Sequence, residues 1–210
     1  MEPNEFECKW IDKNEIWKIA DEVRSKYWPE GILPVNIETI VEARLGLYPD
    51  PLHDLFSTTY MDAYLKMDLS GIVVDYGFYM NEKFANRIRF SFAHELGHYF
   101  LHKDLYSKIN LISAQDWKYF IINIPEIEYR DFEWQANEFA GRLLVPRMEL
   151  VSEVEKVVEI IRAKNLLGFL KDDSDAVLSR VSPALCRVFG VSTDVIEKRV
   201  KREGLWPPKL

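Results

Sequence analysis

The stretch of sequence best suited to chemistry is His94-Glu95-Leu96-Gly97-His98. If this stretch is helical, the two histidines lie one turn apart on nearly the same face, so both imidazoles can reach one metal ion. Glu95 projects beside them, where its carboxylate can take a proton from an attacking water. The pattern therefore predicts a catalytic metal site with His94 and His98 as ligands and Glu95 as the general base.

A catalytic zinc ion takes three protein ligands, so a further ligand must come from elsewhere in the chain. Asp104 lies six residues after His98, but a ligand at that distance needs a glycine at position 101, which is Leu101 here. A separate downstream helix offers Glu133, with Glu138 as the alternative. We therefore expect Glu133 to complete the site.

Two supporting roles also have candidates in the sequence. Asn137 lies one helical turn after Glu133, where its amide can hydrogen-bond to a ligating histidine and orient it. Attack of water on a carbonyl group further needs a donor that stabilises the oxyanion in the transition state. The candidates for this donor are His102, Tyr99, Tyr106 and Tyr119. The sequence alone does not choose among them.

The composition is that of an ordinary globular protein. Of the 210 residues, 48% are hydrophobic and 29% are charged, which excludes collagen-like and wholly disordered chains. The net charge of −7 argues against general affinity for nucleic acids or anionic membranes. No run approaches the length of a membrane span, and the acidic N-terminus does not resemble a signal peptide. These features predict a cytoplasmic protein that does not insert into a membrane.

The apolar spacing predicts an α+β fold that is mostly helical. Helices are predicted over residues 11–27, 36–45, 82–103, 128–144, 149–164, 174–189 and 193–203. Pro49 and Pro51 indicate a turn, and short apolar runs between residues 58 and 80 predict one small, mainly antiparallel sheet. Residues 105–125 read as a long loop with one or two short helices. The helix over residues 82–103 is the most apolar, so we expect it at the centre of the core.

Two longer motifs resemble the ImmA/IrrE family of zinc metallopeptidases. The first runs from Asn86 to His102 and includes both predicted histidine ligands, and the second runs from Glu133 through Asn137 to Pro146. The resemblance implies a zincin-like fold with one Zn²⁺ between two helices. It also implies that the glutamate opening the second motif, Glu133, is the third ligand.

The same resemblance implies a regulatory metallo-endopeptidase that cuts one specific protein. In the family this protein is commonly a helix-turn-helix repressor, which here would be a separate chain, and the genes often belong to bacteria, phages or mobile elements. We expect residues 1–210 to form a single metallopeptidase domain. Within it, residues of about 30–146 would form the catalytic core, and residues 147–210 a helical segment packed on it.

Two other functions remain open at this point. Residues 184–203 have the rhythm of a helix-turn-helix and could bind DNA, although the acidic chain favours packing on the core. The chain could also be a non-catalytic, zinc-containing module that docks on a repressor. A Glu95→Gln variant separates the enzyme from the docking module, because only hydrolysis needs that carboxylate.

Overall fold

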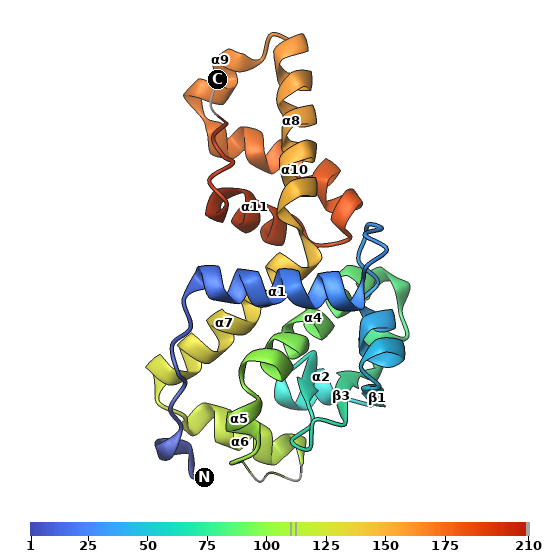
Figure 1. The fold of residues 1–210 in the computed structure, drawn as a ribbon, viewed down its shortest axis with the longest axis vertical. Helices are drawn as coiled ribbons and strands as arrows, with labels where there is room; N and C mark the ends of the chain where they lie inside the picture. Colours follow the sequence, from blue (N-terminus) through green and yellow to red (C-terminus); the bar gives the residue numbers. More distant parts are fainter. Residues whose placement is uncertain (110, 112, 209–210) are drawn as a thin grey trace.

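The most apolar segment of the sequence forms a helix at the centre of the molecule. The computed structural model describes residues 1–109, 111 and 113–208. In it, α4 (Ala85–Leu101) packs along α7 (Glu126–Leu144), and α1 (Lys13–Tyr27) lies against α7 (Figure 1). These three helices confirm the predictions for their segments. Residues 110 and 112 of the predicted loop, and residues 209–210, lie outside the described residues.

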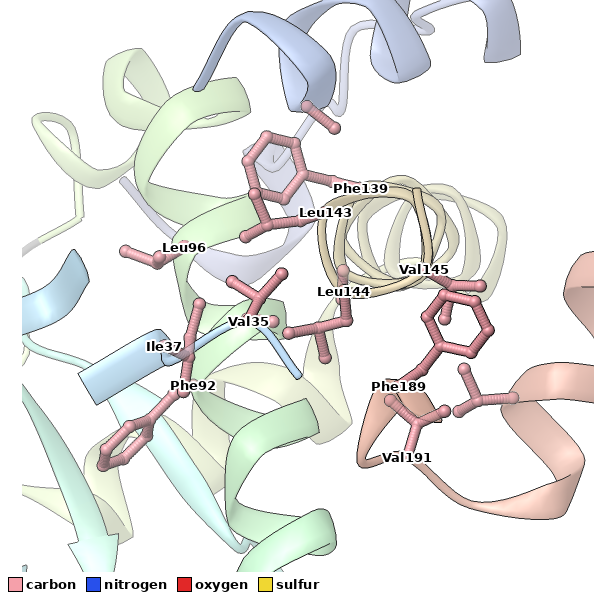
Figure 2. Close-up of a cluster of buried hydrophobic side chains, with 14 of the residues drawn as sticks. Val35, Ile37, Phe92, Leu96, Phe139, Leu143, Leu144, Val145, Phe189 and Val191 are labelled. Carbon is pink, nitrogen blue, oxygen red and sulfur yellow. The ribbon is translucent and has the colours of Figure 1, made fainter. Parts of the chain in front are cut away.

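Helices α4 and α7 approach closely because small residues face each other where they cross. A Cβ atom at Gly97 would lie 2.8 Å from the Cα atom of Ala136, which leaves no room for any side chain there. Around this contact, Phe92 and Leu96 from α4 are fully buried, as is Phe139 from α7 (Figure 2). The crossing therefore fixes which residues of the two helices face each other.

The small sheet lies beside α4 and has the strand order β1-β3-β2. Strand β3 (Gly71–Asp75) pairs in parallel with β1 (Tyr48–Leu52) and antiparallel with β2 (Ala63–Leu65). The α+β class is confirmed. The sheet is mixed, however, which corrects the expectation of a mainly antiparallel one.

The predicted turn at Pro49 and Pro51 is wrong, because both prolines lie in strand β1. The Tyr48 N–H donates to the Ser70 carbonyl over 3.3 Å, and every second residue of a parallel strand faces its partner in this way. The two prolines therefore point their nitrogens away from the ladder. Because β1 is an edge strand, the missing N–H groups cost no sheet hydrogen bond.

Two short runs that read as strands are helical instead. Residues 59–60 lie at the end of α2 (Leu55–Thr59), and residues 78–80 fall in and just after α3 (Tyr76–Tyr79). The first turns of both helices are held by the carboxylate of Asp75. It accepts hydrogen bonds from the backbone N–H groups of Phe56 in α2 and Phe78 in α3, each over 3.0 Å. Capping at the end of β3 thus outweighs the β propensity of these residues.

The remaining helices complete the fold. They are η1 (Pro3–Glu5), the π-helical η2 (Thr39–Arg44), η3 (Glu82–Phe84), α5 (Lys103–Tyr106), α6 (Ala114–Asn123), α8 (Arg147–Ala163), α9 (Leu167–Asp172), α10 (Ser174–Phe189) and α11 (Thr193–Arg202). The helix predicted over residues 36–45 corresponds to η2, and α9 was not predicted. Among the described residues, none of the helices combines the length and the apolar character that a membrane crossing requires.

Helices α10 and α11 form a hairpin that packs on the rest of the chain. Gly190 at the end of α10 has a φ of +61°, and its carbonyl accepts a hydrogen bond from Arg89 of α4 over 2.7 Å. Phe189 and Val191 on either side of this glycine are buried next to Val145 (Figure 2). The segment over residues 184–203 is therefore anchored to α4 and to the end of α7.

Candidate metal centre

The side chains of His94, His98 and Glu133 meet where α4 and α7 cross. The Nε2 atom of His94 lies 3.0 Å from the Nε2 atom of His98 and 3.3 Å from a carboxylate oxygen of Glu133. The other Glu133 oxygen lies 3.6 Å from the Nε2 atom of His98. Each residue thus offers one ligand atom, and the three atoms lie within 4.8 Å of one another.

The size of this triangle fits a zinc ion. In a tetrahedral site with ligands about 2.0–2.1 Å from zinc, neighbouring ligand atoms lie about 3.3 Å apart. The two Nε2 atoms lie 3.0 Å apart, and each lies 3.3 or 3.6 Å from its nearer oxygen of the Glu133 carboxylate, so the observed separations lie on both sides of that value. All three side chains also line a cavity of about 270 Å³, which leaves space for a water and a substrate beside the ion.

The two other carboxylates considered as ligands lie elsewhere. Asp104 is on α5, outside the group of ligand atoms. Glu138 faces away from the histidines, and its carboxylate accepts a hydrogen bond of 3.0 Å from the Trp17 indole on α1. Of the three acidic residues, the fold brings Glu133 to the histidine pair.

His94 and Glu133 form an ion pair in the metal-free protein. Burial alone would lower the pKa of His94, but the charge of Glu133 and its hydrogen bond raise that pKa to about 9. Burial pushes the pKa of Glu133 upwards, and the neighbouring histidines more than offset it, so that this pKa lies well below its ordinary value. A metal ion that binds here must therefore displace a proton from His94.

Glu95 lies in the same cavity but is held by the sheet. Its carboxylate accepts a hydrogen bond of 2.8 Å from the backbone N–H of Leu65 in β2. Burial raises the pKa of Glu95 above its ordinary value, although the charges of His94 and His98 act in the opposite direction. A carboxyl group with a raised pKa is suited to accept and then release a proton near neutral pH.

Asn137 lies where the sequence predicts it. Its Nδ2 group donates to the backbone carbonyl of Glu133 over 2.8 Å, so its Oδ1 atom faces His94, 3.3 Å from the Nδ1 atom. Because an amide oxygen only accepts, His94 carries hydrogen on Nδ1 in this arrangement. Its Nε2 atom then faces His98 and Glu133.

The structure places His102 and Tyr99 away from the cavity, although the sequence offers both as oxyanion donors. His102 is buried behind His98, and both of its ring nitrogens already have protein partners. Tyr99 packs edge-on against Phe100, and it is not one of the described residues that line the cavity. Neither residue belongs to the lining of the cavity that holds the three ligand atoms.

The two other tyrosines considered as donors also lie outside the lining of this cavity. Tyr106 is buried, and Tyr119 is exposed on α6. Among the described residues, neither of them lines the cavity beside the three ligand atoms.

Tyr129 is a cavity residue that the sequence analysis missed. It lies on α7 one turn before Glu133 and lines the cavity with it. Burial and the charges of Glu133 and Glu95 raise the pKa of Tyr129 to about 12, so the phenol stays protonated at neutral pH. The available signal was its spacing of four residues from the predicted ligand, which places both on one face of a helix.

A larger groove runs from the cavity across α7 to α11. Its volume is about 1010 Å³, and Tyr129 and Glu133 belong to its lining as well as to that of the cavity. Phe90 of α4 lies on one wall, and Val195 and Lys198 of α11 lie on the other. The groove therefore leads from Glu133 to α11.

Two histidines on one helix, facing a carboxylate from a second helix, form the ligand arrangement of a metallopeptidase. Residues 78–201 match the family model described as the IrrE N-terminal-like domain, of peptidase family M78. The match covers more than half of the chain, so the protein belongs to this family of metallopeptidases, as the sequence motifs suggest. A search of curated proteins found no match.

Proposed function

We propose that the protein is a zinc-dependent endopeptidase that cuts one specific protein, a separately encoded helix-turn-helix repressor. The observation that carries this proposal is the triangle of His94, His98 and Glu133 beside the buried carboxylate of Glu95. The repressor substrate is inferred from the ImmA/IrrE resemblance, as is a role in the gene regulation of a bacterium, phage or mobile element. Such a substrate would place the reaction in the cytoplasm.

The ligand atoms of His94, His98 and Glu133 would hold one Zn²⁺ per chain. When bound, zinc supplies a Lewis acid that polarises the scissile carbonyl and makes water more acidic. Glu95 takes the proton of the attacking water and delivers it to the departing amine. Asn137 orients His94 through its Nδ1 atom.

Tyr129 is the group we assign to the developing oxyanion. It lines the cavity, it is on the same helix as Glu133, and its raised pKa keeps its hydroxyl a donor. A preorganised donor of this kind stabilises negative charge without having to reorient during the reaction. It takes the role for which the sequence offered His102 and Tyr99.

The groove supports a polypeptide substrate. A groove of about 1010 Å³ that continues from the ligands towards α11 has room for several residues of an extended chain. We infer that residues of about 30–146 form the catalytic core of a single domain, residues 1–210. Residues 147–210 would then pack on that core and form one wall of the groove.

The contacts of α11 do not favour the DNA-binding alternative. All four of its basic side chains near the C-terminal end form ion pairs within the chain. The pairs are Lys198 with Asp194, Arg199 with Glu138 and Glu203, Lys201 with Asp175, and Arg202 with Glu138. Arg199 and Arg202 are therefore already paired with buried carboxylates.

The substrate can be sought by mapping new protein N-termini. Zinc-loaded protein is added to a lysate of its own host cell, and N-termini that appear over time are identified by mass spectrometry. We expect one dominant cleavage, in a DNA-binding repressor, and no such cleavage with Glu95→Gln. Many unrelated cleavages would contradict the single-substrate proposal, and derepression by Glu95→Gln at the wild-type level would favour the docking module.

A further inference from the structure

A chain of hydrogen bonds leads from the N-terminal segment to the metal-facing histidine. It runs from the carbonyl of Lys9 through Gln135 and His102 to His98. We infer that Gln135 is a positioning residue, which acts through His102 to fix the tautomer of His98 that leaves Nε2 free for the metal. This inference rests on the metal site proposed above.

The direction of the first hydrogen bond is set by the backbone. The Lys9 carbonyl can only accept, so the group of Gln135 that lies 3.0 Å from it is the amide Nε2. The same nitrogen also lies 3.6 Å from the sulfur of Cys8. The amide oxygen of Gln135 must therefore point the other way, towards His102.

The next two bonds follow from the first. The Oε1 atom of Gln135 lies 3.2 Å from the Nε2 atom of His102 and can only accept, so His102 carries hydrogen on Nε2. A neutral ring of this tautomer has a lone pair on Nδ1, which lies 2.9 Å from the Nδ1 atom of His98. His98 must then donate from Nδ1, and its Nε2 lone pair faces His94 and Glu133.

Burial makes the donor and acceptor directions of these hydrogen bonds costly to reverse. Gln135 has no exposed surface, and His98 and His102 are each 3% exposed. Either opposite tautomer would place two N–H groups or two lone pairs against each other in this buried row. The ring of Phe132 lies 4.0 Å from that of His98 and 4.4 Å from that of His102, measured between centroids, which restricts rotation of both rings.

The start of the chain of bonds lies far in sequence from the family motifs. Cys8 and Lys9 precede the residues 78–201 that match the family model. The N–H of Cys8 donates to the carboxylate of Glu128 over 2.7 Å, which fixes this N-terminal segment to α7. The segment thus supports the metal centre although it does not touch the ligand atoms.

Histidine tautomers can be read directly by NMR. The full-length wild-type protein is labelled with ¹⁵N-histidine, and long-range ¹H–¹⁵N correlations are recorded with and without zinc. We expect His102 to carry hydrogen on Nε2 in both samples and His98 to carry it on Nδ1, with exposed His53 as an internal reference. Hydrogen on Nδ1 of His102, in either sample, would overturn the inference.

Zinc affinity provides a second readout with matched variants. Gln135→Met removes the amide that orients His102, and His102→Leu removes the acceptor for His98. We expect each to weaken zinc binding about 10–100-fold in competition with a chelator. His102→Asn places a carbonyl oxygen near the present Nδ1 position, so it should restore most of the affinity. Equal weakening by His102→Leu and His102→Asn would overturn the inference.

The proposed function and this inference can fail separately. If wild-type protein binds no zinc, the proposed function fails, while the tautomers of the metal-free sample still test the hydrogen-bonded row. If zinc binds but His102 has the opposite tautomer, the metal site stands and the positioning role of Gln135 fails. The unfolding midpoint of each variant shows whether a loss of affinity reflects a loss of folding.

Discussion

Two of the four glutamates of helix α7, Glu133 and Glu138, lie five residues apart in opposite surroundings. Glu133 faces two histidines at the edge of a cavity, whereas the side chain of Glu138 is fully buried beneath α1 and α11. Five residues correspond to a rotation of about 140° around a helix, so the two carboxylates leave α7 on different faces. One face of α7 therefore serves the metal centre, and the other holds the fold together.

The buried face is a network of ion pairs. Glu138 contacts Trp17, Arg199 and Arg202, and one turn further along α7, Arg142 donates to the buried carboxylate of Glu203 over 2.6 Å. The carboxylate of Glu138 accepts a hydrogen bond from Trp17 and pairs with the guanidinium groups of Arg199 and Arg202, on the side of α7 that faces away from the histidines. What each glutamate can do is thus decided by the partners that the fold brings to it.

The largest expected effect is on the cavity side. Replacing Glu95 with Gln removes the proton acceptor but leaves the ligand atoms in place, so we expect kcat to fall about 10²–10⁴-fold with zinc retained. The measurement is cleavage of the identified substrate under single-turnover conditions, with metal content determined on the same sample. Wild-type turnover by this variant would show that Glu95 is not the general base.

On the buried side, Glu138→Met tests the opposite expectation. The change leaves Arg199 without one of its buried carboxylate partners, so the free energy of unfolding should fall by about 3–5 kcal/mol. Zinc affinity of the folded fraction should not change, because Glu138 does not face the site. Denaturant titration with and without zinc measures both. If this variant kept the stability of the wild type but no longer bound zinc, the expected roles of Glu133 and Glu138 would be reversed.

Gly97→Ala tests whether the helix crossing creates the site. The added Cβ would lie 2.8 Å from the Cα of Ala136, so α4 and α7 must separate, at a cost of about 1–3 kcal/mol. Separation also moves Glu133 from the histidines and should weaken zinc binding. Gly168→Ala is the matched control, since an added Cβ there meets nothing within 4 Å. Equal unfolding free energies for the two variants would contradict the close contact.

The metal site should also respond to pH. Because the folded pKa of His94, about 9, lies above its unfolded value and that of Glu133 lies below, their ion pair stabilises the metal-free protein fully between about pH 4.5 and 6.5. That stabilisation is lost as the pH rises through 9. Zinc displaces this proton, so its apparent affinity should rise about tenfold per pH unit below 9. Calorimetry in buffers of different ionisation enthalpy checks this, and an affinity independent of pH would contradict it.

Local patterns explain which parts of the site could be predicted. The histidine pair and Glu95 lie within one helical turn, and the spacing of Asn137 from Glu133 is also local, so helix geometry alone places these residues. The four-residue spacing of Tyr129 from Glu133 is local as well, whereas the role of Gln135 depends on which face of α7 meets α4, and that follows from the Gly97 contact with Ala136. Sequence periodicity does not contain this information.

The fold shows the same division between local and tertiary information. The long helices follow from their apolar spacing, as for α4 and α7. The strand at Pro49 and Pro51 exists because a neighbouring strand accepts its alternate N–H groups, which the local sequence cannot indicate. Likewise, the first turns of α2 and α3 both depend on hydrogen bonds to the carboxylate of Asp75, and the one to α2 joins residues that are far apart in the sequence.

The most direct test of the account is the metal content of three proteins. Wild type, Glu133→Gln and Glu138→Gln are purified, offered zinc, dialysed and analysed by mass spectrometry. We expect about one zinc per chain in wild type and Glu138→Gln, and loss of zinc in Glu133→Gln. Full zinc retention by Glu133→Gln, or no zinc in wild type, would contradict the assignment of the two faces of α7.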